Sequence, residues 1–180
     1  FVDYEDRNTA ILFGDGAGAV VVANGGGHKL LDFFLTASGR GWKSLLIPAG
    51  GSRLPASPIT VELKLHAFRM KGKEVFRNAV TGMERAIRAV LRRSNLSPDD
   101  ISLFVPHQAN ERITVALAES LGIDEERVFS NISHLGNTSS ASIPLALKEI
   151  EEKGILKSGD LLCLASFGAG YTCGACIMEW

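Results

Sequence analysis

The sequence predicts an α/β protein with functional side chains at the ends of buried strands. An apolar run over 101–105 predicts a buried strand, and apolar residues repeat at helical spacing over 113–121 and again over 139–153. Buried strands that run out into helices are typical of α/β proteins. Proteins of this class place their chemistry where such strands end.

The first part of the chain is expected to consist of strands and turns. Residues 10–13 and 19–23 are predicted as strands joined by the glycine-rich segment 14–18, and 30–36 as a further strand. A phosphate-binding loop is excluded, because it needs a helix after the glycines and the residues that follow are β-branched. Close backbone packing or a bulge is the simpler role for these glycines.

The middle of the chain combines a loop, a strand and a long basic helix. Residues 38–58 are rich in Gly, Pro and Ser, which predicts a long surface loop. Alternation over 61–65 predicts a half-buried strand, with His66 facing water. A helix is predicted over 73–93. Residues 69–93 hold eight Lys and Arg against two Glu, which fits an acidic partner, a phosphate ligand or a merely solvated helix face.

Two strand-to-helix corners carry the most informative polar residues. Pro106 ends the strand 101–105 just before His107, and 107–110 lead into the next helix. After a brief strand at 128–130, Asn137-Thr138 is a plausible N-cap of the helix 139–153. Either residue alone is more simply a capping residue. Together they offer two hydrogen-bond donors to a carbonyl oxygen that gains charge, as an enolate-forming site requires.

These motifs resemble the C-terminal part of β-ketoacyl-acyl carrier protein synthase III, a family of condensing enzymes with the thiolase-like fold. The matching segments, in family order, are 6–7, 13–19, 70–76, 107–110, 136–139 and 167–170. The resemblance implies the C-terminal part of a layered α-β-α-β-α fold, including most of its second pseudo-repeat. Residues 1–37 would be the closing strands of the N-terminal half, and 38–180 the C-terminal half. The nucleophilic cysteine of the family would lie upstream of residue 1.

The resemblance also implies an activity. This activity is the decarboxylative condensation of acyl-coenzyme A with malonyl-acyl carrier protein, which starts fatty acid synthesis without a metal or cofactor. His107 and Asn137 would bind the malonyl thioester carbonyl, and the backbone amide of Ala169 would serve a second oxyanion site. Arg77 and Arg112 would dock the acidic carrier protein. The implied substrate-binding residues are Arg7, Met70, Gly72, Phe76, Ala109, Asn110 and Phe167.

Composition indicates a soluble, cytoplasmic protein: 46% hydrophobic and 22% charged residues, a net charge of −1, and no apolar run near the roughly 20 residues of a membrane span. Nucleic acid is a weak candidate partner, because aromatic residues are not interleaved with the basic ones. Metal-ligand spacing is absent. Cys163, Cys173 and Cys176 are expected to pack in the core, because free Cys is usually buried. Redox or zinc chemistry at Cys173 and Cys176 is improbable, since residues three apart on the predicted strand 171–179 face opposite sides of the sheet.

Two departures from the family pattern affect the expected site. Ala169 stands where a third glycine is common, which leaves its amide available but adds a methyl group near the acyl pocket. His134 is a second imidazole near Asn137 and is expected to be structural. A thiolase-like relative that acts on another acceptor and a noncatalytic module remain alternatives. The family forms homodimers, and the upstream part would be a further partner.

Overall fold

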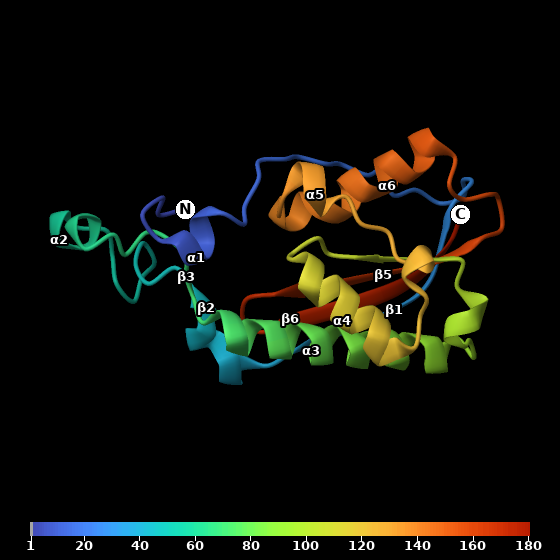
Figure 1. The fold of residues 1–180 in the computed structure, drawn as a ribbon, viewed down its shortest axis with the longest axis horizontal. Helices are drawn as coiled ribbons and strands as arrows, with labels where there is room; N and C mark the ends of the chain where they lie inside the picture. Colours follow the sequence, from blue (N-terminus) through green and yellow to red (C-terminus); the bar gives the residue numbers. More distant parts are fainter. Residues whose placement is uncertain (1) are drawn as a thin grey trace.

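A four-stranded sheet forms the centre of the structure, a computed structural model that describes residues 2–180 (Figure 1). The strand order is β1-β6-β5-β4, where the strands span Lys29–Ala37 (β1), Thr172–Glu179 (β6), Leu161–Gly168 (β5) and Leu103–Pro106 (β4). Strands β4 and β5 are parallel, whereas β6 runs antiparallel to both of its neighbours. A parallel bridge between Phe104 and Val128 extends the sheet beyond β4, so the predicted strand 128–130 is reduced to one bridge.

Helices cover both faces of this sheet (Figure 1). Helices α3 (Gly72–Arg93) and α4 (Glu111–Leu121) lie on one face, and α5 (Ile132–Leu135) and α6 (Ser142–Lys153) lie on the other. Strand β4 contributes Phe104 to the core under α3 and α4, and Leu103 and Val105 to a second core that includes α6 residues. A strand that is buried on both faces is apolar throughout, which explains the continuous run that predicted it.

The three long helices confirm their predictions, and their ends have local causes. Asn110 caps α4 by accepting a hydrogen bond from the Arg112 N–H at 3.0 Å. Gly122 ends α4 and Gly154 ends α6, both in the left-handed region. The predicted helix 139–153 begins as a 3-10 turn, η4 (Ser139–Ala141), before α6.

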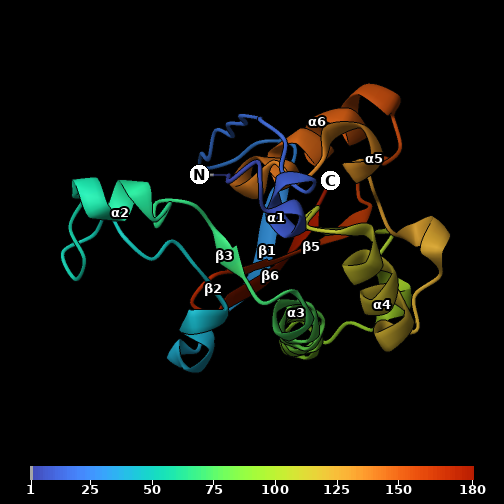
Figure 2. The ribbon, with the colours of Figure 1, turned by 60° about the vertical axis from the view of Figure 1, so that its left-hand side comes forward.

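Shorter elements occupy the periphery. They are α1 (Arg7–Ala10), η1 (Gly39–Ser44), β2 (Leu45–Leu46), α2 (Pro58–Glu62), β3 (Arg69–Met70), η2 (Pro98–Asp100) and η3 (Glu125–Arg127). Strands β2 and β3 form a separate antiparallel pair, and α2 projects away from the sheet (Figure 2). The predicted loop 38–58 therefore holds two short elements, η1 and β2, and the first residue of α2, Pro58.

The predicted strands 10–13 and 19–23 are wrong. Ala10 is the last residue of α1. Phe13 makes one bridge to Asn137, and residues 14–23 pair with no strand among the described residues. A β-branched run forms a strand only when a neighbouring strand takes its backbone hydrogen bonds. The glycines confirm the close-packing interpretation, because a Cβ on Gly16 would lie 2.9 Å from Leu145 Cδ1 of α6.

The predicted strand 61–65 is also wrong. Ser57 and Thr60 form a capping box at the start of α2, and Pro58 occupies its first turn. These start signals outweigh the short alternation of apolar residues. His66 does not simply face water: it is half-buried, and its Nε2 lies 3.0 Å from Thr60 Oγ1.

Strand β1 links the two sides of the division predicted near residue 37. It pairs with β6 along its length, from Lys29 opposite Glu179 to Ala37 opposite Thr172. Residues 29–37 therefore share a sheet with the C-terminal strands instead of closing a separate sheet. The division into 1–37 and 38–180 itself stays a prediction. Among the described helices, none combines the length and the apolar character that crossing a membrane requires.

Candidate active site

The first corner holds His107 at the end of β4. The His107 N–H donates to the Ala165 carbonyl oxygen of β5 at 2.7 Å, so the parallel ladder fixes its backbone. The next residue, Gln108, is buried, and its carboxamide nitrogen donates to the carbonyl oxygens of Pro106 and Phe129 at 2.8 and 3.2 Å. Its carboxamide oxygen accepts from the Asn131 N–H at 3.1 Å. Gln108 thus ties the corner to the segment that leads into α5.

The second corner holds Asn137 between α5 and η4. Its N–H donates to the Leu12 carbonyl oxygen at 2.9 Å, and its own carbonyl accepts from the Gly14 N–H at 3.0 Å. The carboxamide oxygen accepts from the Ser139 N–H at 2.9 Å, a local contact two residues along the chain. The N-cap of η4 is Thr138 and that of α6 is Ala141, so Asn137 itself is not the N-cap of either element. Because the carboxamide oxygen faces the Ser139 N–H, the carboxamide nitrogen points elsewhere, and it donates to no group within residues 2–180.

The imidazole of His107 connects the two corners. Its Nδ1 lies 2.6 Å from Ser142 Oγ in the first turn of α6, the helix that follows Asn137. Burial lowers the pKa of His107 to about 4, because desolvation disfavours the cationic form. At neutral pH the imidazole is therefore neutral, and only one of its ring nitrogens carries a proton.

The two predicted donors therefore have their other polar atoms already engaged. Nδ1 of His107 contacts Ser142, and the carboxamide oxygen of Asn137 contacts Ser139. Nε2 of His107 and Nδ2 of Asn137 have no partner in the part of the chain that the structure describes. Each is available for a carbonyl oxygen of a bound molecule.

The remaining predicted site residues lie on several elements. Met70 is in β3, Gly72 begins α3, and Ala109 follows His107. Ala169 is exposed in the turn between β5 and β6, with Gly170 at φ 138°. Asn110, another predicted substrate-binding residue, is the N-cap of α4.

Two predicted aromatic contacts differ in their surroundings. Phe167 is buried in the core beside Tyr171, with ring centroids 4.9 Å apart. Phe76 is 37% exposed on α3. The buried side of this helix follows Val75 and Ala79, so Phe76 faces outward and does not belong to the apolar side of the helix.

The three arginines predicted to contact anionic groups form no ion pair within the described residues. Arg7 lies in α1, Arg77 in α3 and Arg112 in α4, and all three are exposed. None of their guanidinium groups forms an ion pair with a residue of the described range 2–180. Helices α3 and α4 pack together, so Arg77 and Arg112 belong to one helical layer.

The three cysteines have packing roles. Cys163 is buried, whereas Cys173 and Cys176 are half-buried and all three are free. Cys173 packs against the core under α3, and Cys176 pairs with Leu164, which packs on the other core. The prediction that they face opposite sides is confirmed. Burial raises the pKa of all three thiols, which keeps them protonated and unreactive at neutral pH.

The rival imidazole of His134 has a structural partner. Its Nε2 lies 3.3 Å from Glu149 Oε2, and the same carboxylate accepts from the Asn131 carboxamide at 3.0 Å. These contacts join α5 to α6 and support the structural role expected for His134. Within residues 2–180, no group of three or more His, Cys, Asp and Glu is arranged to hold a metal ion.

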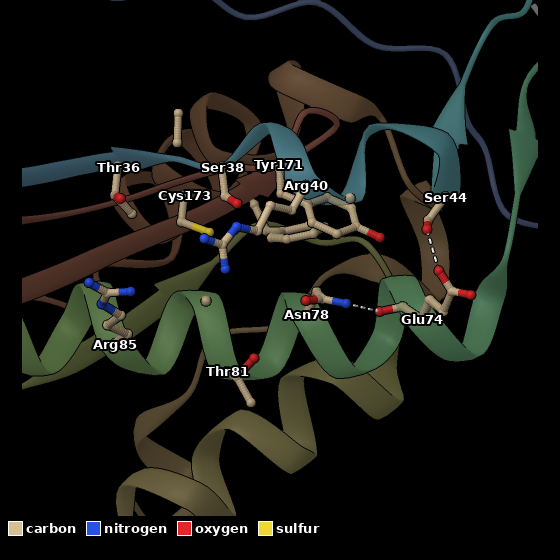
Figure 3. Close-up of a pocket in the computed structure, with 14 residues that line it drawn as sticks. Thr36, Ser38, Arg40, Ser44, Glu74, Asn78, Thr81, Arg85, Tyr171 and Cys173 are labelled. Atoms are coloured by element: carbon tan, nitrogen blue, oxygen red, sulfur yellow. Dashed lines mark hydrogen bonds between the residues drawn. The ribbon is translucent and has the colours of Figure 1, made fainter.

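A cavity of about 550 Å³ lies apart from the donor pair (Figure 3). It is enclosed by the end of β1, by η1, by one side of α3 and by Tyr171 and Cys173. Arg40 and Arg85 line it, and Ser44 donates a hydrogen bond to Glu74 at one end. Phe167 is the one predicted site residue that lines this cavity. The cavity therefore does not contain His107 or Asn137.

Sequence reasoning missed the roles of Ser142 and Gln108. Both are buried polar residues that join segments distant in the chain. Ser142 lies outside the matched segment 136–139, and no spacing rule indicates that its hydroxyl contacts an imidazole 35 positions earlier. Gln108 lies in the matched segment 107–110, but neither composition nor periodicity indicates that its side chain is buried and joins two segments.

A mixed sheet covered by helices on both faces, with polar corners at His107 and Asn137, is in agreement with the thiolase-like fold. Comparison with solved structures agrees. The 3-oxoacyl-acyl carrier protein synthase III of Aquifex aeolicus matches at a TM-score of 0.86 and 43% identity, over 99% of this chain and 54% of that one. The corresponding Pseudomonas aeruginosa structure matches at 0.88 and 43%, over 99% and 55%.

Sequence comparison gives the same family. Residues 91–180 match 3-oxoacyl-[acyl-carrier-protein] synthase III C terminal, and residues 1–39 match 3-oxoacyl-[acyl-carrier-protein] synthase III. The β-ketoacyl-[acyl-carrier-protein] synthase III of Caldanaerobacter subterraneus subsp. tengcongensis is 46% identical over 99% of this chain and 54% of its own length. The chain belongs to the 3-oxoacyl-acyl carrier protein synthase III family. It spans about half the length of the relatives it matches.

Proposed function

We propose that this chain supplies the enolate-stabilising half of a β-ketoacyl-acyl carrier protein synthase III. The proposal depends mainly on one observation: His107 and Asn137 each keep one nitrogen without an internal partner, while their other polar side-chain atoms are fixed by hydrogen bonds. Family membership and the polar corners at the sheet end support the same reading.

In the proposed reaction, a cysteine thiolate from a part of the protein before this chain attacks the carbonyl of acyl-coenzyme A. The coenzyme A thiolate leaves, and a thioester to the enzyme remains. Malonyl-acyl carrier protein then loses its carboxylate as carbon dioxide, and the electron pair passes to the α-carbon. The resulting enolate attacks the enzyme thioester, releases the cysteine thiolate and yields the 3-oxoacyl product.

The donors act on the decarboxylation step. Nε2–H of His107 and Nδ2–H of Asn137 would hydrogen-bond the malonyl thioester oxygen, which becomes the enolate oxygen. Such a donor contributes about 3 kcal/mol when it is aimed at developing charge in a site that excludes water. A neutral imidazole suits this role, because it donates one proton without introducing a charge that must be desolvated. The reaction needs no metal or organic cofactor.

Other family residues complete the proposed site. The backbone N–H of Ala169 would stabilise the oxyanion of the enzyme thioester. The surfaces near α1, β3, α3 and α4, together with Phe167 of β5, would hold the pantetheine arm and the nucleotide end; the residues are Arg7, Met70, Gly72, Phe76, Ala109, Asn110 and Phe167. Arg77 and Arg112 would dock the acyl carrier protein. We further propose that the complete protein is a cytoplasmic homodimer.

Decarboxylation of a malonyl thioester, measured as carbon dioxide release, tests the proposal in the full-length polypeptide that contains this chain. His107→Ala and Asn137→Ala are each expected to lower kcat by about 100-fold, the loss typical of one oxyanion donor. His134→Ala is the matched control, because this imidazole is occupied by Glu149, and it should keep normal activity. Normal decarboxylation by both site variants would contradict the proposal.

A further inference from the structure

The single proton of the neutral His107 ring has two possible positions, and only one of them suits the proposed role. A proton on Nε2 leaves an N–H donor facing away from Ser142, whereas a proton on Nδ1 would point at Ser142 and leave Nε2 as an acceptor. The contact between His107 and Ser142 therefore decides whether the imidazole can act as a donor.

The hydrogen bonds around Ser142 fix the direction of this contact. The Gln108 N–H can only donate, and it lies 3.3 Å from Ser142 Oγ, so the hydroxyl oxygen accepts there. Ser142 is 2% exposed, which leaves its hydroxyl proton little access to water. Nδ1 of His107, at 2.6 Å, is the one acceptor for this proton among the contacts of Ser142 in the described chain.

Each arrangement has a different hydrogen-bond balance. If Ser142 donates to Nδ1, the Gln108 N–H, the hydroxyl and the imidazole nitrogen are all satisfied. If Nδ1 carried the proton, Ser142 Oγ would accept two hydrogen bonds and its buried hydroxyl proton would have no acceptor. A buried unpaired polar group costs about 1–3 kcal/mol. The first arrangement is therefore the stable one.

We propose that Ser142 is a positioning residue that holds His107 as the Nε2–H tautomer and aims this N–H at the substrate oxygen. The inference rests on the proposed function, because it assigns a cause to the donor state that the reaction requires. Gln108 supports the arrangement from behind, since its backbone N–H orients the hydroxyl and its side chain anchors the same corner. The hydrogen bonds thus run in one direction: the Gln108 N–H donates to Ser142 Oγ, and the Ser142 hydroxyl donates to His107 Nδ1.

Selective ¹⁵N labelling of histidine reads the tautomer directly in the full-length polypeptide. At pH 7 the ¹⁵N NMR spectrum should show Nδ1 of His107 unprotonated and Nε2 protonated, with the assignment made by comparison with His107→Ala. In Ser142→Ala the Nδ1 resonance should shift, because its hydrogen bond is lost. Detection of a protonated Nδ1 in the unsubstituted protein would overturn the proposal without any variant.

Kinetics of malonyl thioester decarboxylation give the second readout. Ser142→Ala should lower kcat roughly 10-fold with KM changed less than about twofold, because the donor is misdirected while the binding surface is kept. Ser142→Thr keeps the hydroxyl and should recover most of the rate. Ser140→Ala is the matched control, since this serine is exposed and the side-chain hydrogen bond of His107 goes to Ser142. If Ser142→Ala kept its kcat while His107→Ala was inactive, the positioning role of Ser142 would be refuted and the proposed function would stand. Normal activity in both His107→Ala and Asn137→Ala would refute the proposed function itself.

Discussion

At the scale of single residues, His107 links the chemistry of the site to the stability of the fold. Burial at the end of β4 keeps its imidazole neutral, because the cationic form would lose its hydration. The same effect opposes protonation of the folded protein, whereas the unfolded chain binds a proton at the ordinary histidine pKa. Stability and pH are therefore coupled through this residue.

The pKa of His107 is about 4 in the fold and 6.5 in its reference state. As pH falls below about 6.5, the imidazole is protonated in the unfolded chain but not in the folded chain. The contribution of this group to the free energy of unfolding therefore decreases until about pH 4. Between pH 7.5 and 5 the loss is about 2 kcal/mol. Urea unfolding of the full-length polypeptide should show this loss of unfolding free energy between pH 7.5 and 5. In His107→Ala the loss over the same pH range should be smaller by about 2 kcal/mol. Equal losses in both proteins would contradict the assignment.

The site was predictable to the extent that it follows from strand ends. His107 and Asn137 could be found because Pro106 ends a strand and a Gly-Asn-Thr segment begins a helix, which are local signals. Ser142 and Gln108 could not, since their partners are separated from them in the chain and depend on how β4, α5 and α6 pack. Which ring nitrogen of His107 is protonated follows from those contacts, so the sequence left it open.

At the scale of elements, long amphipathic helices were predicted well and short strands poorly. The helix over 73–93 presents a buried apolar side along six turns, which no competing signal contradicts. Residues 19–23 have strand character, yet the described chain offers them no partner, and Val21 is 97% exposed. At 61–65 the capping box of Ser57 and Thr60 decides in favour of a helical turn. The hydropathy pattern therefore does not show whether a strand has a neighbour to pair with or whether a helix cap overrides a strand.

The segment that carries Gly14 holds Asn137 in place, which gives a test at this scale. A Cβ on Gly14 would overlap the Leu135 carbonyl oxygen, a backbone atom that cannot rotate away. Gly14→Ala is therefore expected to lower the free energy of unfolding by about 2 kcal/mol, a typical cost of overpacking. Gly39→Ala is the matched control, because nothing lies within 4 Å of its Cβ position. Chemical denaturation of both variants measures the difference, and equal stabilities would show that the segment yields easily.

At the scale of the whole molecule, one face of the edge strand β1 is apolar and exposed. Leu31, Phe33 and Leu35 alternate along β1 and are 46%, 52% and 72% exposed, while Phe34 between them packs into the core. The extended residues Val20, Val21 and Val22 add to this exposed apolar surface. Exposed apolar surface of this kind is typical of an interface. The relatives are nearly twice as long as this chain, in agreement with a larger assembly around the same sheet.

The opposite side of the molecule has a different character, because the basic helix α3 faces outward there. Part of its charge is balanced within the chain: Arg88 pairs with Glu84 at 2.8 Å, and Arg93 pairs with Asp32 at 2.9 Å. Arg77 and Arg92 have no such carboxylate among the described residues. The positive charge that remains on this layer is therefore available to an acidic partner, as carrier-protein docking requires.

Charge reversal tests the proposed docking of the acyl carrier protein in the full-length polypeptide. Arg77→Glu and Arg112→Glu should each raise KM for malonyl-acyl carrier protein roughly 10-fold, because a like charge now faces the acidic partner, and the effect should shrink as salt screens it. Malonyl-pantetheine lacks the carrier protein, so its kcat/KM should stay unchanged. Arg92→Glu is the control, because it makes the same charge reversal in the last turn of the same helix. If Arg92→Glu weakened the reaction as much as Arg77→Glu does, the effect would come from net charge, and Arg77 and Arg112 would not form a defined docking site.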